Sequence, residues 1–537
     1  MKNRLWLVAV TGGILSGLAW HDKATGLIML CALLPFLYIF QYSMNEKAAP
    51  GLVFIRVLPG FILYNLLTIL WLRNASWAGA VYAVTVNAFL MSSVFWIASV
   101  IYKRSSLFMG YTSIVSFWII FEHINSRISI LTPWLNLGNV LGNEIMFIQW
   151  YDVTGVAGGS LWILLCNLAL FFIIFRRNKR PGSLLRQMLT FLLLFSIPFA
   201  VSIFKYFNTD IEGQKSEFLI IQPNIDPYTG KFSGSSFETQ LQKMLKMAEN
   251  NISPRTDWII LPETAIDDPF YEEDVLNNYY YRMIDSLLAT VDSISLVTGV
   301  TTMRSVHRTG SGLPSGAFST DSSDNFFEVY NTAMQVNPGS DVHFYHKSKL
   351  VPGIEKKIRI LPRFIEDVLI PDLGGTMTGY GTQDERSVFI HPEGGVRGAP
   401  VICYESVYGD FVTGYIRKGA NVIIIITNDG WWKNTAGYRQ HLMFARIRAI
   451  ENRRPVVRAA NTGISCFTDR KGNITRRTEW WEEGVLRDSV RINNDMSFYS
   501  LHGDFISRYV SVFGAFILII TFIGAPLQRL RYYQKFR

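Results

Sequence analysis

Three short stretches of the sequence place a Glu, a Lys and a Cys where each would end a buried strand. Leu261-Pro-Glu-Thr-Ala-Ile266 holds Glu263, Tyr345-His-Lys-Ser-Lys-Leu-Val-Pro352 holds Lys347, and Val401-Ile-Cys-Tyr-Glu-Ser406 holds Cys403. A thiol can attack a carbonyl carbon once a base takes its proton, and a cation can stabilise the oxyanion that forms. These three residue types together indicate acyl transfer through a cysteine.

The chain is too apolar for an ordinary soluble protein of its size. Of its 537 residues, 49% are hydrophobic, and the mean hydropathy is +0.19. Long apolar runs fill the first part of the chain, whereas later runs shorten to strand length and charged residues return. We expect a membrane domain over 1–205, a second domain over 206–505, and a final helix with a basic tail over 506–537.

Eight apolar runs approach the roughly 20 residues that cross a bilayer. They cover Leu5–Trp20, Gly26–Tyr42, Val53–Leu72, Ala78–Tyr102, Leu107–His123, Gly158–Phe175, Leu189–Phe204 and Tyr509–Leu527. The first run follows Lys2 and Arg4 and could be a cleaved signal peptide, but it lacks an Ala-x-Ala site and further runs follow it. We therefore expect an uncleaved helix, and about seven spans before the second domain.

Basic residues gather at alternate ends of the predicted spans. With a cytoplasmic N-terminus, the inside segments are 1–4, the Lys47 loop, Lys103-Arg104, the basic run within 176–186 and the tail 529–537. Seven spans then put the second domain outside the cytoplasm. The net charge of +9 follows from this topology, so we expect no nucleic-acid partner.

The second domain alternates strand-like and helix-like patterns. The expected strands are Glu217–Asn224, Asp257–Pro262, Ser295–Thr301, Tyr330–Val336, Val388–His391, Pro400–Tyr404, Asn421–Thr427 and Pro455–Ala460. The expected helices are Phe237–Glu249, Val275–Ala289, Gly409–Lys418 and Tyr438–Asn452. This alternation predicts a layered α/β domain, whose sites form beyond the carboxyl ends of the strands, where Glu263 and Cys403 fall.

Cysteine is scarce in this sequence. Cys31 and Cys166 lie in apolar runs, and Cys403 and Cys466 lie in the second domain. Two cysteines are too few for a disulfide framework, although a single Cys403–Cys466 bridge stays open by counting. The sequence has no His and Cys spacing typical of zinc and no Gly-rich phosphate loop, so we expect no metal or cofactor.

The second domain resembles the nitrilase superfamily of carbon-nitrogen hydrolases. That superfamily carries a Glu in Pro-Glu-[ST]-Ala, a Lys in Tyr-x-Lys-x-x-Leu and a Cys after an apolar strand, which match Glu263, Lys347 and Cys403 in order. The apolar spans on both sides narrow the resemblance to the apolipoprotein N-acyltransferases. Further matching segments are Pro133-Trp-Leu, Gln222-Pro-Asn-Ile225, Thr427-Asn-Asp-Gly-Trp-Trp432 and the stretch 445–455.

The resemblance implies a multi-span α-helical membrane domain with an extracytoplasmic α/β nitrilase-like domain, an α-β-β-α sandwich. It implies a bacterial inner-membrane enzyme with its catalytic domain in the periplasm. Such an N-acyltransferase moves an acyl chain from a phospholipid, through a cysteine thioester, to the N-terminal α-amine of S-diacylglyceryl cysteine on an apolipoprotein. Its partners would be the phospholipid donor, the apolipoprotein acceptor and the bilayer, and we expect a monomer without cofactor.

The resemblance also assigns roles to the residues of the site. Glu263 would be the general base, with a pKa nearer neutrality than usual. Lys347 would lower the pKa of the Cys403 thiol and, with the Tyr404 N–H, hold the oxyanion. Glu355, Tyr404 and Glu405 would support these groups.

Several alternatives stay open on the sequence. Lys349 competes with Lys347, and Glu405 could form a buried ion pair with an arginine. The loop Leu350-Val-Pro-Gly-Ile-Glu355 departs from the family's Leu-Val-Pro-Phe-Gly-Glu, which leaves its conformation in doubt. The alternative function is a membrane-tethered amidase that uses water as second nucleophile. A transporter or scaffold with an inactive domain fits less well, because the Glu, Lys and Cys are intact and charged residues are lacking inside the spans.

Overall fold

The computed structural model describes residues 4–175, 182–209, 212–228, 236–291, 293–306, 317–319, 326–339, 341–356 and 379–534. Contacts between Cα atoms divide the chain into two compact units. The first comprises Met1–Trp71, Ala80–Asn208 and Asp504–Arg537, and the second comprises Leu72–Gly79 and Thr209–Gly503. Residues 176–181 of the basic run, and the end of the basic tail, lie outside the described residues.

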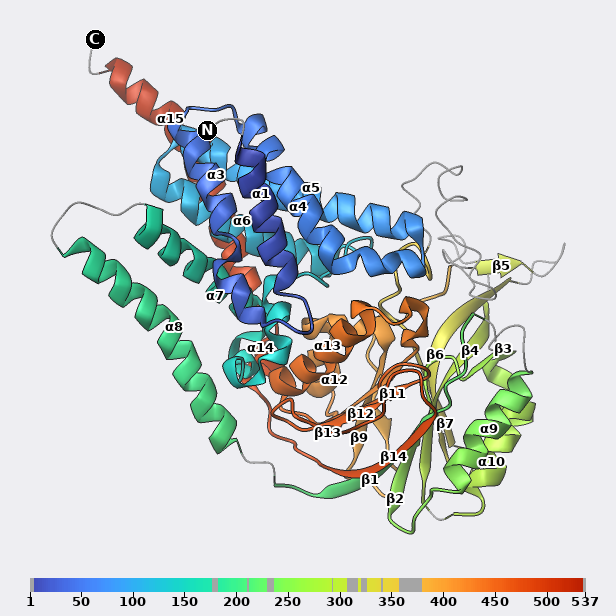
Figure 1. Cartoon of the computed structure of the whole chain (residues 1–537). Helices are drawn as coiled ribbons and strands as arrows, with labels where there is room; N and C mark the ends of the chain where they lie inside the picture. The colour runs from blue at the N-terminus through green and yellow to red at the C-terminus, as the bar shows by residue number, and fades with distance from the viewer. Residues whose placement is uncertain are drawn as a thin grey trace. The chain divides into compact units, whose positions relative to one another are not determined.

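The first unit is built from helices (Figure 1). They are α1 (Leu5–Leu18), α2 (Met29–Ala32), α3 (Leu34–Asn45), α4 (Pro50–Ile69), α5 (Trp77–Arg104), α6 (Leu107–Arg127), α7 (Tyr151–Phe175), α8 (Ser183–Asn208) and α15 (Phe505–Gln534). Within the described residues, seven helical segments are long and apolar enough to cross a membrane, one of which joins α2 and α3 over Gly26–Asn45. The multi-span helical domain expected from the sequence is thus present.

The first predicted span is shorter than expected. It forms only the 14-residue helix α1, which falls below the roughly 20 residues that cross a bilayer. The chain leaves the helix at Ala19 and Trp20, just before the polar run His21-Asp22-Lys23. Hydropathy in this stretch therefore predicted a helix correctly but overestimated its length.

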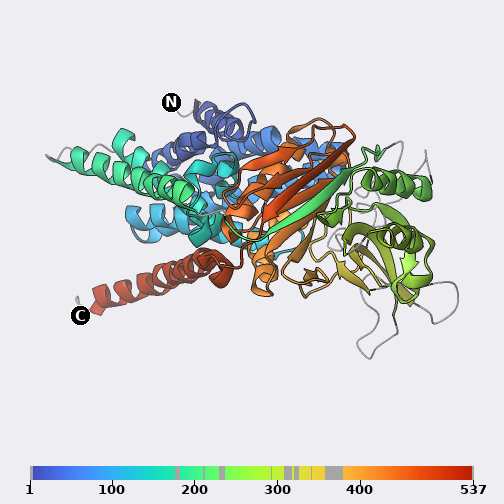
Figure 2. The same ribbon diagram turned by 90° about the horizontal axis from the view of Figure 1, so that it is seen from below.

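The second unit contains two β-sheets. The strands of the larger sheet are β1 (Lys215–Gln222), β2 (Thr256–Ile260), β3 (Ile266–Tyr271), β4 (Ser295–Val306), β5 (Ala317–Ser319), β6 (Phe326–Asn337), β7 (Asp341–His346) and β14 (Gly484–Arg491). Their order is β14-β1-β2-β4-β6-β5, with β3 beside β4 and β7 beside β6. Figure 2 shows β1, in green, running beside β14, in red, although the two strands lie at opposite ends of this unit's sequence.

The smaller sheet has the order β13-β12-β11-β10-β9-β8. Its strands are β8 (Phe389–Ile390), β9 (Arg397–Ile402), β10 (Val422–Thr427), β11 (Val456–Ala460), β12 (Cys466–Thr468) and β13 (Ile474–Arg477). β9, β10 and β11 are parallel, as are β1, β2 and β4 in the larger sheet. The residues of β10 are all buried, as expected of a strand covered on both faces.

Helices cover the outer face of each sheet (Figure 1). Helices α9 (Phe237–Glu249) and α10 (Tyr279–Leu288) pack on the larger sheet, and their buried side chains share one hydrophobic core with β1, β2 and β4. Helices α12 (Gly409–Arg417) and α13 (Ala436–Asn452) pack on the smaller sheet. This is the α-β-β-α sandwich that the resemblance implied.

The predicted helix Val275–Ala289 is wrong in its first turn. The chain instead forms a 3₁₀ helix over Glu272–Asn277 and begins α10 at Tyr279. The side chain of Asn278 accepts hydrogen bonds from the backbone N–H groups of Tyr280 and Tyr281, which makes it the N-cap of α10. Asn278 lies inside the apolar helical pattern, and as a capping residue it divides the segment into the 3₁₀ helix and α10.

A glycine in β4 should be essential for the position of the turn that carries Glu263. A Cβ at Gly299 would lie 2.4 Å from the Thr264 nitrogen and 2.5 Å from the Glu263 Cα atom. We expect Gly299→Ala to lower the free energy of unfolding by about 1–3 kcal/mol, since backbone must move to admit the methyl group. Thermal unfolding in detergent measures this change. Gly51→Ala is the control, because a Cβ there meets nothing within 4 Å.

Candidate active site

Glu263 lies just beyond the carboxyl end of β2, in a turn that is buried in the second unit. Its Oε1 atom accepts hydrogen bonds from Asn331 Nδ2 at 2.9 Å and from Lys347 Nζ at 2.9 Å. Its Oε2 atom accepts a hydrogen bond from the backbone N–H of Asn428 at 3.2 Å, at the end of β10. Both sheets therefore hold this carboxylate in place.

Lys347 follows the last residue of β7 and is 1% exposed. Its ammonium group contacts two carboxylates, Glu263 Oε1 at 2.9 Å and Glu355 Oε1 at 2.7 Å. The Asn331 amide donates to the same two oxygen atoms. Lys349 lies elsewhere, with its ammonium 5.4 Å from the centre of the Tyr408 ring. The structure thus brings Lys347, and not Lys349, to Glu263.

The loop 350–355 departs from the family pattern but still places the Glu355 carboxylate beside Lys347. Gly353 adopts a φ of 77°, a left-handed conformation that glycine reaches without strain. The Glu355 N–H then donates to the Val351 carbonyl at 3.0 Å, and Glu355 Oε2 accepts from the Val351 N–H at 2.8 Å. The turn closes on itself and leaves Glu355 Oε1 facing Lys347.

Cys403 begins a 3₁₀ turn, Cys403–Val407, directly after β9. Its φ of 48° lies in the left-handed region, which is strained for a residue with a side chain. Glu263, Lys347 and Thr427 lie close enough to act on the ionisation of the thiol. Cys403 and Cys466 are both free cysteines, so the bridge left open by the sequence does not form.

Glu405 connects the lysine segment to the cysteine segment. Its Oε1 atom accepts hydrogen bonds from the Tyr345 hydroxyl and the Ser348 N–H, both at 2.7 Å. Its Oε2 atom accepts from the Ile402 N–H at 2.9 Å. Burial raises the pKa of Glu405 to about 7, although these hydrogen bonds act to lower it. The carboxyl group is therefore bound by hydroxyl and backbone donors, and the arginine pair considered from the sequence is not what holds it.

Tyr404 is 7% exposed and stacks edge-on against Tyr408, with ring centroids 5.3 Å apart. Its hydroxyl accepts a hydrogen bond from the Tyr408 hydroxyl at 3.2 Å. Its side chain is thus fixed by packing within the second unit, and its backbone follows directly on Cys403.

The charges of the site depend on one another. Burial opposes ionisation of Glu263, but the Lys347 charge and the Asn331 hydrogen bond outweigh burial and hold the pKa of Glu263 below its ordinary value. Burial opposes the charge of Lys347 too, yet Glu263 and Glu355 hold its pKa well above the usual range. Burial and the Glu263 charge raise the pKa of Cys403 well above its ordinary value. The resting site therefore holds a carboxylate, an ammonium and a neutral thiol.

One electrostatic expectation is wrong in direction, and a second is right for the effect of Lys347 but not for the net shift. We expected a Glu263 pKa nearer neutrality and a Cys403 pKa lowered by Lys347. Lys347 does lower the pKa of Cys403, but burial and the carboxylate of Glu263 act in the opposite direction and prevail. For Glu263 burial is outweighed by the Lys347 charge and the Asn331 hydrogen bond, so its pKa lies below its ordinary value and not nearer neutrality.

Sequence reasoning missed Asn331, which lies on β6 and is buried. Its side-chain amide donates to Glu263 Oε1 at 2.9 Å and Glu355 Oε1 at 3.0 Å, and its backbone carbonyl accepts from the backbone N–H of Lys347 at 2.9 Å. It lies between the carboxylates that flank the ammonium. An Asn within an apolar strand pattern, Tyr330–Val336, was the signal that could have identified it.

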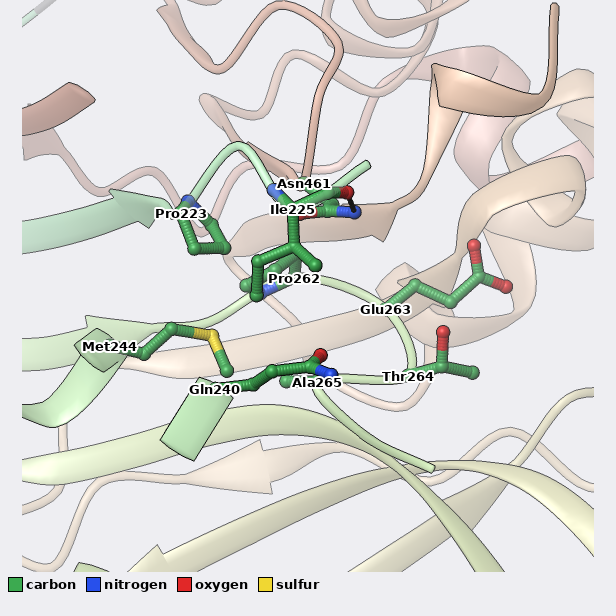
Figure 3. Close-up of a pocket in the computed structure, with 9 residues that line it drawn as sticks. All are labelled: Pro223, Ile225, Gln240, Met244, Pro262, Glu263, Thr264, Ala265 and Asn461. Carbon is green, nitrogen blue, oxygen red and sulfur yellow. Dashed lines mark hydrogen bonds between the residues drawn. The ribbon is translucent and has the colours of Figure 1, made fainter. Parts of the chain in front are cut away.

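A small cavity lies beside the turn that carries Glu263 (Figure 3). Its lining is Pro223, Ile225, Gln240, Met244, Pro262, Glu263, Thr264, Ala265 and Asn461. Figure 3 shows the Glu263 carboxylate pointing away from the Pro223 and Met244 side chains. Over the part of the chain that the structure describes, no group of three His, Cys, Asp or Glu residues could hold a metal ion.

Two family models match the chain. One, the carbon-nitrogen hydrolase, covers residues 220–493, and the other, the apolipoprotein N-acyltransferase N-terminal domain, covers residues 12–169. The apolipoprotein N-acyltransferase of Chlorobaculum tepidum is 28% identical over 521 residues, 94% of each chain. That of Geobacter metallireducens is 27% identical over 547 residues and covers 96% of this chain and 95% of the relative.

Among solved structures, Saccharomyces cerevisiae Nit3, a member of branch 10 of the nitrilase superfamily, is similar to part of this chain. It is 16% identical with a TM-score of 0.37, and the alignment covers 52% of this chain and 92% of Nit3.

Removing the Glu263 charge should make the thiol more acidic. The carboxylate raises the pKa of Cys403, while Lys347 remains charged beside Glu355. In Glu263→Gln we therefore expect the pH midpoint of Cys403 alkylation by iodoacetamide to move to lower pH than in the wild type. The exposed Glu385 provides the control Glu385→Gln, which should leave the midpoint unchanged. An unchanged or higher midpoint in Glu263→Gln would contradict this electrostatic account.

Proposed function

The chain belongs to the carbon-nitrogen hydrolase family, in its apolipoprotein N-acyltransferase branch, and we propose that it N-acylates lipoproteins by a two-step exchange. A phospholipid gives an acyl chain to Cys403, and the N-terminal α-amine of an S-diacylglyceryl cysteine on an apolipoprotein receives it. The observation that carries this proposal is the buried meeting of Glu263, Lys347 and Cys403 at the ends of three strands.

In the first step, Glu263 accepts the thiol proton as the sulfur attacks the ester carbonyl. The C–S bond forms, the ester C–O bond breaks, and the proton on Glu263 passes to the departing lysophospholipid oxygen. The sulfur is left as a thioester. The Lys347 ammonium, and the backbone N–H of Tyr404, would hold the oxyanion of the tetrahedral intermediate.

In the second step, the α-amine attacks the thioester carbonyl. Glu263 takes a proton from the amine nitrogen, the C–N bond forms, and the C–S bond breaks. The proton then returns to the Cys403 sulfur, which restores the resting site. Glu355 would keep Lys347 charged and in place during both steps, since its oxygen lies 2.7 Å from the ammonium.

The pKa directions favour proton transfer that is concerted with attack. Burial and the charge of Glu263 both disfavour a stable thiolate, which the raised pKa of Cys403 reflects. When Glu263 takes the proton as the sulfur attacks, the negative charge moves from the carboxylate to the carbonyl oxygen, and the number of charges stays the same. The ammonium of Lys347 can then shift its interaction from Glu263 to that oxygen.

The second unit includes a short segment from the connection between two apolar helices. Leu72–Gly79 is part of the second unit, although it joins two segments that are apolar enough to cross a membrane. The Asn74 side chain donates to the Trp432 carbonyl at 3.1 Å, and the Tyr228 hydroxyl donates to the Asn74 carbonyl at 3.2 Å. The turn with Trp432 begins directly after Asn428, whose N–H reaches Glu263.

The apolar helices and the relatives support a multi-pass bacterial membrane protein. We place it in the inner membrane with the second unit in the periplasm, because the Lys47 loop, Lys103-Arg104 and the basic run within 176–186 favour cytoplasmic span ends, and Ser183–Asn208 then leads out of the cytoplasm. This orientation does not require α1 to cross. A single chain supplies Glu263, Lys347 and Cys403, so we propose that it acts as a monomer.

The thioester is the decisive intermediate. After incubation with phosphatidylethanolamine, we expect the intact mass of the wild type to rise by one acyl group, which neutral hydroxylamine should remove. Cys403→Ala should abolish the adduct. Cys466→Ala is the matched control, since Cys466 is also buried and free but lies in β12. Absence of an adduct in a folded preparation that cleaves small amides would favour an amidase instead.

A further inference from the structure

A buried polar network lies behind the cysteine turn and takes no part in the proposed proton transfers. His441, on α13, is 1% exposed, and its Nδ1 atom lies 2.9 Å from Asp429 Oδ1. Arg458 Nη2, on β11, lies 2.6 Å from Asp429 Oδ2, and the Thr427 hydroxyl donates to Asp429 Oδ1 at 2.9 Å. Arg458 also donates to the backbone carbonyl of Ile464. Asp429 and Arg458 thus fix one edge of the imidazole ring.

The other edge of the ring faces the backbone of Cys403. His441 Nε2 lies 3.1 Å from the Cys403 carbonyl oxygen and 2.9 Å from the Ser406 hydroxyl. Because a carbonyl oxygen can only accept, Nε2 carries the proton in this contact. The Ser406 hydroxyl donates to the same carbonyl at 2.7 Å. Two side chains therefore hold this carbonyl, one of them anchored through Asp429.

The Cys403 carbonyl belongs to the same peptide plane as the Tyr404 N–H. In a trans peptide the two bonds point in opposite directions, so fixing one fixes the other. The chain has no cis peptide bonds in its described part. A hydrogen bond accepted by the carbonyl also polarises the peptide and strengthens its N–H as a donor.

We propose that His441, held by Asp429, is a positioning residue that aims the Tyr404 N–H at the oxyanion by binding the Cys403 carbonyl. The same contact keeps Cys403 at its left-handed φ of 48°. In this role His441 acts on the carbonyl through its Nε2 atom and is assigned no proton transfer. This inference rests on the proposed function, since it deepens the first step of that reaction.

The test compares two reactions of the same thiol. Acylation of Cys403 by a p-nitrophenyl ester forms an oxyanion, whereas alkylation by iodoacetamide displaces iodide and forms none. In His441→Phe, which keeps a ring but removes the donor, we expect the acylation burst to slow by about 100-fold, as on loss of an oxyanion donor, with alkylation changed by less than about 3-fold. Rates are counted per titrated thiol, so a loss of folded protein does not mimic the result.

His391→Phe is the matched control. His391 is also buried, and its Nε2 atom lies 3.2 Å from the backbone carbonyl of Asp257, away from Cys403. It should change neither rate. Ser406→Ala removes the other donor to the Cys403 carbonyl, and it should shift the ratio of the two rates in the same direction but less strongly. This variant decides the matter if His441→Phe does not fold.

Three results would overturn the inference: parallel losses of acylation and alkylation in His441→Phe, no change in either rate, or no burst in the wild type. Failure of the proposed function gives a different result. The wild type would then show the p-nitrophenyl ester burst but no acyl adduct from phosphatidylethanolamine, and the rate ratio of the variants would still decide the role of His441.

Discussion

The buried ammonium of Lys347 is the constraint on which the site depends. A cation taken out of water costs several kcal/mol unless anions and hydrogen bonds surround it. Glu263 and Glu355 supply the anions, and the Asn331 amide holds both carboxylates in place. Burial and the negative charge of Glu263 in turn keep the Cys403 thiol protonated. The pKa values of the base, the cation and the nucleophile therefore depend on one another.

The two sheets each contribute part of this arrangement. The larger sheet carries Glu263 and Lys347, and the smaller sheet carries Cys403 at the end of β9. Hydrogen bonds join the sheets at the site, such as that from the Asn428 N–H to Glu263. Below them, Gln222 at the end of β1 accepts a hydrogen bond from the Ser465 hydroxyl at 2.7 Å. The sandwich thus sets the distance between base and nucleophile, and local turns set their direction.

Local sequence predicted the parts of the site that local structure determines. Glu263, Lys347 and Cys403 were identified because each follows an apolar run in a recognisable motif. Asn331 and His441 were not, because their partners lie 68 and 38 residues away in the chain, and no spacing rule connects them.

The fold, too, was predictable where local sequence determines it and not where distant segments pair. The strands β9, β10 and β11 follow the apolar pattern, whereas the pairing of β14 with β1 joins residues that only the folded chain brings together. The directions of the pKa shifts were the least predictable, because each shift depends on burial and on all neighbouring groups at once.

Glu405 shows why the segment after the cysteine needs a carboxylate rather than any polar residue. The hydrogen-bonding groups that face its two oxygens are a hydroxyl and backbone N–H groups, from Tyr345 and Ser348 on one side and Ile402 on the other. A glutamine there would turn an N–H₂ group toward a donor and leave one side unsatisfied in a buried position. Tyr345 and Ser348 flank Lys347, and Ile402 precedes Cys403. Loss of one of these hydrogen bonds would therefore disturb the position of the ammonium relative to the thiol. Glu405 can therefore determine the geometry of the reaction without touching a substrate.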